Sequence, residues 1–396
     1  MGHGDIPLII DKSTFQSLSV DETMELSHCY RITQTPTMLM EILADIKKNE
    51  GSDQVIEKVK SLAHKTCLLH GMFVPTAQTL VRAELRGNPI QMDGRPVVLH
   101  GVHHDDPIGG SGIYFDEPPE FATLRRWEDG DFTTDEQILA EQWRTITHKL
   151  NIEKWKQRQT QFSSVRDLDS LRRSVNGLLA SGSTAQFKML NQLMDDLRIP
   201  PSEQQILGGK WVKFGLPDLR RCAPYTAYCI SVFYTFYMGV ASNLFGTKDT
   251  NRVDLDYLLY FPFTRCFSSG DAFHLKIAPL FMDQDLIIPA DILKFDLASL
   301  RSQRETRTPE QHALHRQTFG NRPGDDSSSI TCRLYNHLFG PPKPEPTPIP
   351  RNPEEESALV RRFNEMAERA EVSKRKQREI TGDPKTEFPP PPIQPP

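Results

Sequence analysis

The stretch P-L-I-I-D-K-S-T, Pro7 to Thr14, decides how the chain begins to fold. Leu8, Ile9 and Ile10 form a continuous apolar run, which is typical of a strand buried on both faces. The run ends on Asp11, and Lys12 and the small hydroxyl residues Ser13 and Thr14 follow. An acid at this position either caps the next helix, through the amides of Ser13 or Thr14, or contributes a carboxylate to a site. Both interpretations stay open from the sequence alone.

Length and composition limit the possible classes of protein. A chain of 396 residues exceeds the usual size of one core, so we expect two or more lobes. The net charge of −5 is not typical of a nucleic-acid binder, and such a partner would require local basic patches. The six cysteines are scattered and form no C-x-x-C pair, which indicates neither a disulfide scaffold nor a zinc site. With no signal peptide recognisable in the first residues, we expect a cytoplasmic protein.

One uncharged stretch, Cys222 to Gly246, is long enough to cross a bilayer. It is rich in Tyr, Ser and Thr, and charged residues stand directly before it, whereas a membrane span is more uniformly apolar. We therefore predict a buried helix over residues 223–245, whose tyrosine hydroxyls find partners. A membrane-associated protein is the alternative interpretation.

The composition and the predicted secondary structure change several times along the chain. We expect an α/β core built from two separate segments, a mainly helical insertion, a basic extension with little periodicity, and a charged helix followed by a disordered Pro-rich tail. The corresponding residues are 1–75 and 215–300 for the core, 76–214 for the insertion, 301–350 for the extension and 351–396 for the helix and tail.

Local signals predict several elements of the core. A helix begins near Val20 with Ser19 or Asp21 as its cap, and a second begins at Pro36 with Thr35 as its cap. The alternating stretch Thr264–Ser269 predicts a short strand.

Acidic residues occur at matching positions in both core segments. Asp11 and Asp271 each follow a predicted strand, and Glu41 and Asp45 lie four residues apart on one face of a predicted helix. Asp254 and Asp256 precede the apolar stretch 257–263, where each could simply cap a helix. Acids at the carboxyl ends of parallel strands point into the crevice where ligands bind. Several carboxylates gathered there need a cation to stay ionised, and oxygen ligands suit Mg²⁺ or Mn²⁺.

In order and spacing, these stretches resemble the PIN-domain family of metal-dependent ribonucleases, in a PIN-like variant with a long insertion. I-I-D-K-S-T resembles the opening strand that ends in Asp, and P-T-M-L-M-E-I-L-A-D-I resembles the helix that carries a Glu. V-D-L-D-Y-L-L-Y-F-P-F-T-R-C-F-S-S-G-D-A-F-H resembles an Asp that opens a helix, followed by a strand that ends in Ser and Asp. The resemblance covers roughly residues 5–75 and 220–297.

The resemblance implies a three-layer α/β/α sandwich around a mostly parallel sheet, with an acidic pocket that binds Mg²⁺ or Mn²⁺ and cleaves single-stranded or structured RNA. No membrane partner is implied. The catalytic and metal-binding residues would be Asp11, Glu41, Asp254 and Asp271, supported by Asp45, Asp256 and the hydroxyl of Ser269 or Ser268. Either Asp254 or Asp256 could be the third acid. The alternative is a PIN-like fold kept as a non-catalytic binding or scaffold module.

Two further features bear on function. H-G-V-H-H-D-D-P contains potential metal ligands, but its Gly and Pro flanks predict a loop without fixed ligand geometry; the residues are His100, His103, His104, Asp105 and Asp106. Basic residues gather between Lys154 and Arg173 and between Arg301 and Arg322. Either group could contact phosphates, or could belong to a solvated face.

Overall fold

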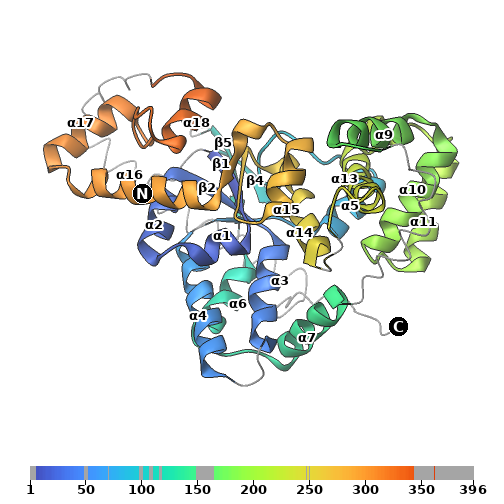
Figure 1. Cartoon of the computed structure of the whole chain (residues 1–396), viewed down its shortest axis with the longest axis horizontal. Coiled ribbons are helices and arrows are strands. Elements are labelled where there is room, and N and C mark those ends of the chain that lie inside the picture. The colour runs from blue at the N-terminus through green and yellow to red at the C-terminus, as the bar shows by residue number, and fades with distance from the viewer. Residues whose placement is uncertain are drawn as a thin grey trace.

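The computed structural model describes most of the chain, which Figure 1 shows as a whole. The described residues are 6–48, 52–69, 71–97, 101–106, 110–115, 118–148, 165–246, 248, 250–342 and 361. The predicted charged helix and Pro-rich tail therefore lie, except for residue 361, outside the described residues, as do Lys154, Lys156 and Arg158 of the first basic group.

Five of the described strands form one sheet in which every neighbouring pair is parallel, so the predicted α/β class is confirmed. All five residues of the central strand β1 are buried, as its apolar sequence predicts. The strands lie in the order β3 (Met72–Phe73), β2 (Tyr30–Gln34), β1 (Ile6–Ile10), β6 (Cys266–Ser269) and β7 (Ile287–Pro289).

The sheet takes strands from two distant parts of the chain. β1, β2 and β3 belong to the first 75 residues, whereas β6 and β7 follow residue 265. β1 pairs directly with β6, and Ile10 stands opposite Ser268 in the register. Helices from both parts also meet, since α2 (Val20–Cys29) packs against α16 (Ala290–Glu305), which is visible in Figure 1 as blue beside orange.

The first helices begin where their capping residues predict. Ser19 forms a capping box with Glu22 at the start of α2. Thr35 caps α3 (Pro36–Ala44) by accepting a hydrogen bond from the Met38 amide at 3.3 Å. The remaining helices of this part are α1 (Lys12–Ser17), the 3₁₀ turn η1 (Asp45–Lys47) and α4 (Asp53–Leu68).

The described residues between 76 and 214 are mainly helical, as expected. Their helices are α5 (Ala77–Leu85), α6 (Pro119–Glu128), α7 (Thr134–His148), α9 (Leu168–Ala180), α10 (Ser183–Asp196) and α11 (Pro201–Lys213). The prediction of a loop around the histidine-rich stretch is wrong, because β4 (Gly101–Asp106) and β5 (Gly110–Phe115) form an antiparallel pair. Pairing with β5 satisfies the backbone groups of β4, and a Gly- and Pro-rich composition does not reveal that pairing. His100 lies outside the described residues, and β4 is described as backbone only.

The uncharged stretch forms the helix α13 (Pro224–Ala241), which is largely buried and confirms the helix prediction. The Tyr225 hydroxyl donates to the Leu259 carbonyl at 3.2 Å, and the Tyr228 hydroxyl donates to the Leu258 carbonyl at 2.7 Å. In the described part of the chain, no helix is both long enough and apolar enough to cross a membrane.

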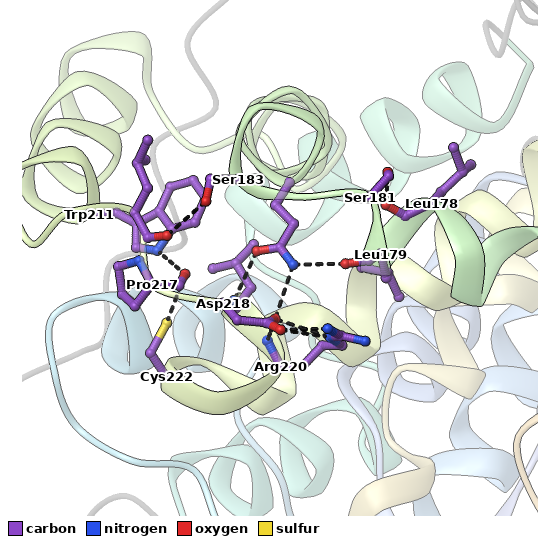
Figure 2. Close-up of polar contacts among 12 residues, drawn as sticks. Leu178, Leu179, Ser181, Ser183, Trp211, Pro217, Asp218, Arg220 and Cys222 are labelled. Atoms are coloured by element: carbon purple, nitrogen blue, oxygen red, sulfur yellow. Dashed lines mark hydrogen bonds and ion pairs between the residues drawn. The ribbon is translucent and has the colours of Figure 1, made fainter.

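A short turn ties the helices of the insertion to α13. Asp218 caps α12 (Leu219–Cys222) by accepting from the Arg220 amide at 3.0 Å, and it also accepts from the Gln186 amide group on α10 at 3.0 Å (Figure 2). The Trp211 indole on α11 donates to the Pro217 carbonyl at 3.0 Å. These contacts fix the entry into α13.

The last part of the described chain contains helices that the sequence did not predict. The expectation of little periodicity is wrong for the described residues 301–342: α16 runs through the expected boundary at residue 300, and α18 (Ile330–Phe339) buries Tyr335, whose hydroxyl donates to the Cys29 carbonyl at 2.8 Å. Contacts with α2 and β2 order this extension. The other elements after α13 are α14 (Thr250–Leu258), η3 (Phe261–Phe263), α15 (Ala272–Ile277), η4 (Ala278–Leu280), η5 (Gln284–Leu286), α17 (Pro309–Phe319) and α18 (Ile330–Phe339).

Arginines of the second basic group connect helices. On α16, Arg301 forms ion pairs with Asp21 and Glu305, and Arg304 forms one with Glu25 at 2.7 Å. These side chains hold α16 against α2.

Candidate functional site

The strand order reverses between β1 and β6. From β1 the chain moves through β2 to β3 on one side, and from β6 it moves to β7 on the other. Asp11 follows β1 directly, and its amide donates to the Ser268 carbonyl at 3.1 Å, so the carboxyl ends of these two strands lie side by side. In open α/β sheets, ligands bind in the crevice at such a switch point.

Asp11 is buried and fully engaged by hydrogen-bond donors. One carboxylate oxygen accepts from the Thr14 amide at 2.8 Å, which makes Asp11 the N-cap of α1. The other oxygen accepts from the hydroxyls of Ser13 at 2.8 Å and Ser269 at 2.6 Å. Burial alone would raise the pKa of Asp11, but contacts with His274, Ser269 and Thr14 outweigh it and lower that pKa. The carboxylate is therefore ionised, and it is at once a helix cap and part of a site.

The residue that sequence reasoning missed is His274, in the first turn of α15. It is 1% exposed, and its Nδ1 lies 2.8 Å from the Ser269 hydroxyl and 3.4 Å from the Asp11 carboxylate. Its Nε2 lies 2.7 Å from the backbone carbonyl of Asp254, so this nitrogen carries a proton. The sequence signal was the spacing D-x-x-H, which places the imidazole one helical turn after Asp271.

Hydrogen-bond counting favours a doubly protonated His274. The single proton of the Ser269 hydroxyl goes to Asp11, so the proton between Ser269 and Nδ1 comes from the imidazole. Burial opposes a charged imidazole, but the hydrogen bond to Asp11 and the charges of Asp254 and Asp11 raise the pKa of His274. The Asp11 carboxylate thus favours the charged form of the buried imidazole.

Glu41 and Asp254 carry carboxylates whose ionised forms are disfavoured. Burial raises the pKa of Glu41, although a hydrogen bond from the Tyr257 hydroxyl and the charge of Lys12 oppose that rise. Burial, together with the charges of Asp271, Glu41 and Asp11, raises the pKa of Asp254 to about 7, against the opposing charge of His274. The charges of all three other predicted acids therefore act on Asp254.

Asp271 and Asp254 occupy different positions in their helices. Asp271 is the N-cap of α15 and accepts from the Phe273 amide at 2.6 Å. Asp254 lies inside α14, as does Asp256, so the alternative that they simply cap a helix is excluded, and Asp254 does not open its helix as the resemblance implies. The helix begins at Thr250, so residues 250–253 form its first turn rather than a loop before it.

The predicted supporting residues divide into two groups. Ser269 contacts Asp11, whereas Ser268 is buried with no hydrogen-bond partner for its hydroxyl among the described residues. Asp256 forms an ion pair with Arg252, and Asp45 forms one with Lys12 at 2.7 Å. Asp45 and Asp256 are therefore paired with basic side chains of the chain itself.

The donor chemistry at this edge of the sheet fits a hard divalent cation. Glu41, Asp254 and Asp271 offer half-buried carboxylate oxygens, and Asp254 is held among like charges that a cation would neutralise. As the side chains are placed, no three His, Cys, Asp or Glu residues in the described ranges stand together closely enough to hold a metal ion.

Comparison with known protein families, curated proteins and solved structures finds no match for this chain. The geometry of the site therefore carries the functional interpretation.

Proposed function

We propose that this protein is a metal-dependent endonuclease with a PIN-like three-layer fold, which hydrolyses phosphodiester bonds in RNA in the cytoplasm. The observation that carries the proposal is the burial of Asp254 where the charges of Asp271, Glu41 and Asp11 act on it, which together raise its pKa. Carboxylates gathered in this way are ionised together only when a cation lies among them.

The position of the acids at the sheet edge adds support. Asp11 and Asp271 follow neighbouring strands at the point where the strand order reverses, which is the usual place for a ligand in such a sheet. The order of the acids along the chain, with Glu41 on a helix after β1 and Asp254 before β6, agrees with the resemblance to the PIN-domain family.

Each residue has a role that its contacts support. Asp11, Glu41, Asp254 and Asp271 would hold Mg²⁺ or Mn²⁺, which when bound acidifies a water and stabilises a departing oxygen. Ser269 and His274 orient the Asp11 carboxylate through hydrogen bonds at 2.6 Å and 3.4 Å. Tyr257 orients Glu41 by donating its hydroxyl proton.

Cleavage of single-stranded RNA in the presence of Mg²⁺ or Mn²⁺ tests the proposal. Asp11→Asn and Asp271→Asn each remove a charge but keep the shape, so we expect the protein to fold and cleavage to fall about 100-fold or more. Asp53→Asn is the matched control, because Asp53 is an exposed acid in the first turn of α4. Equal cleavage by the wild type and all variants would point to a contaminating nuclease and contradict the proposal.

A non-catalytic binding module is the second candidate, and the Asp11–His274 pair favours it. The imidazolium neutralises Asp11 without a metal, so the fold can be stable with no cation present. In that case we expect no cleavage by the wild type, and no rise in melting temperature when Mg²⁺ or Mn²⁺ is added. Metal-dependent cleavage that disappears in both Asn variants would exclude this candidate.

A further inference from the structure

Three lysines surround a single buried aspartate beside the candidate site. The Asp45 carboxylate lies 2.7 Å from the Lys12 ammonium, 3.4 Å from that of Lys58 and 3.6 Å from that of Lys48. We refer to Lys12, Lys48 and Lys58 as the lysine cluster. Its members come from α1, from the residue after η1 and from α4, so the fold brings them together.

The lysine cluster carries more positive charge than its surroundings neutralise. Three ammonium groups share the charge of Asp45, and the charge of Glu41 also acts on Lys12. If both acids are ionised, one positive charge remains, and Lys48 and Lys12 repel each other. An anion that approaches the cluster is therefore attracted to it.

The cluster is open to solvent on one side. The Lys48 side chain is 56% exposed and that of Lys58 is 35% exposed, whereas that of Lys12 is 12% exposed. Lys12 is therefore the inner member, held by Asp45 and by the Glu41 carbonyl at 2.9 Å. Lys48 and Lys58 are the members that an incoming ligand can reach.

The cluster adjoins the acids at the sheet edge. Lys12 follows Asp11 directly in the chain, and its amide lies 3.2 Å from the Tyr257 hydroxyl that also contacts Glu41. Glu41 and Asp45 lie one helical turn apart along α3 and η1. A nucleic-acid strand that places one phosphate at the acids would therefore bring another phosphate to the lysines.

We propose that Lys48 and Lys58, supported by Lys12 and positioned by Asp45, bind a backbone phosphate of a single nucleic-acid strand beside the acidic site. This inference takes its class of ligand from the proposed function. Lysine ammonium groups bind phosphates without reading the base sequence, and they release counterions as they do so.

The test measures binding of a labelled single-stranded RNA by fluorescence anisotropy, in EDTA so that nothing is cleaved, over a series of salt concentrations. We expect Lys48→Gln and Lys58→Gln each to weaken binding about fivefold at about 0.1 M salt, and to reduce the slope of log K against log salt by about 0.7. Lys60→Gln is the matched control, because Lys60 lies on α4 but is already paired with Glu57 at 2.7 Å. Unchanged affinity and slope in both cluster variants would overturn the inference, as would a wild type that does not bind RNA.

Two further measurements separate this inference from the nuclease proposal. Lysine-dependent binding without cleavage would support the inference and contradict the nuclease. RNA cleavage by the wild type, together with normal RNA binding by the cluster variants, would support the nuclease and contradict the inference. A DNA strand of the same sequence should show the same lysine dependence, since phosphate is the group recognised. A lysine effect confined to RNA would overturn the assignment to phosphate.

Discussion

At the scale of single residues, the most unusual charge outside the candidate site is Lys65 on α4. It is 4% exposed, and its ammonium donates to the carbonyls of Phe15 at 2.9 Å and Leu18 at 2.8 Å. The same ammonium lies 4.9 Å from the centre of the Phe15 ring. Lys65 thus donates to carbonyls where α1 ends, at Phe15 and at the C-cap Leu18, and the Phe15 carbonyl also accepts from the Leu18 amide at 3.4 Å.

Burial lowers the pKa of Lys65 to about 8, whereas an unfolded chain keeps that proton up to about pH 10.4. Between these values the unfolded state binds more protons, so the contribution of Lys65 to the free energy of unfolding rises with pH. We expect the difference in unfolding free energy between the wild type and Lys65→Met to grow in favour of the wild type from about pH 8 to about pH 10. Urea unfolding at several pH values measures it.

Lys60→Met provides the comparison for this pH dependence, because Lys60 is partly exposed on the same helix. The difference in unfolding free energy between the wild type and Lys60→Met should not grow with pH as it does for Lys65→Met. A flat difference for Lys65→Met over the same range would show that the burial of Lys65 does not lower its pKa.

At the scale of elements, α13 depends on a close contact with the chain that follows it. Phe245 folds back against the helix, and a Cβ atom added at Gly239 would lie 2.1 Å from the Phe245 ring. Both residues are buried, so the ring has no free space to move into. Gly239 is therefore required by packing, although glycine is a poor residue inside a helix.

We expect Gly239→Ala to destabilise the protein by about 1–3 kcal/mol, because the overlap with Phe245 exceeds the gain in helix propensity. Gly177→Ala is the matched variant, since Gly177 lies inside α9 with nothing within 4 Å of an added Cβ. It should stabilise the protein by about 0.5–1 kcal/mol. Chemical denaturation of both variants measures these changes, and a shift of the same sign in both would contradict the packing explanation.

At the scale of the whole molecule, the helical insertion and the core share a buried connection. Glu84 on α5 is 4% exposed and accepts from the amides of Tyr225 at 3.0 Å and Thr226 at 2.7 Å. These amides belong to the first turn of α13, whose N-terminus carries no cap of its own. A carboxylate from the insertion thus satisfies a core helix and complements its dipole.

We expect Glu84→Ala to lower the free energy of unfolding by about 2–4 kcal/mol, because it leaves two buried amides and the Thr226 hydroxyl without an acceptor. Since the connection joins both parts, circular dichroism and the fluorescence of the four tryptophans, which all lie within residues 76–214, should report the same shifted transition. Glu57→Ala, at a 68% exposed side chain on α4, should change stability by less than about 0.5 kcal/mol. Separate transitions for the two probes would show that the insertion unfolds independently of the core.

The sequence by itself determined the elements whose signals are local. The apolar run before Asp11 identified β1, and Thr35 and Pro36 identified the start of α3, because each signal and its partner lie within a few residues. Thr264–Ser269 identified β6 for the same reason. The positions of Asp11 and Asp271 after strands and of Glu41 on a helix were also predictable, since such spacing is visible in the sequence, whereas their role in one site stays a prediction.

Only the tertiary structure decided which of these side chains meet. His274 contacts Asp11 across 263 positions of the chain, and Ser269 rather than Ser268 turns toward it, because the pairing of β1 with β6 determines which side chains share a face. The lysine cluster likewise formed only when α4 packed beside η1. Sequence spacing cannot reveal such contacts, because they depend on strand register and on the packing of residues that are distant in the chain.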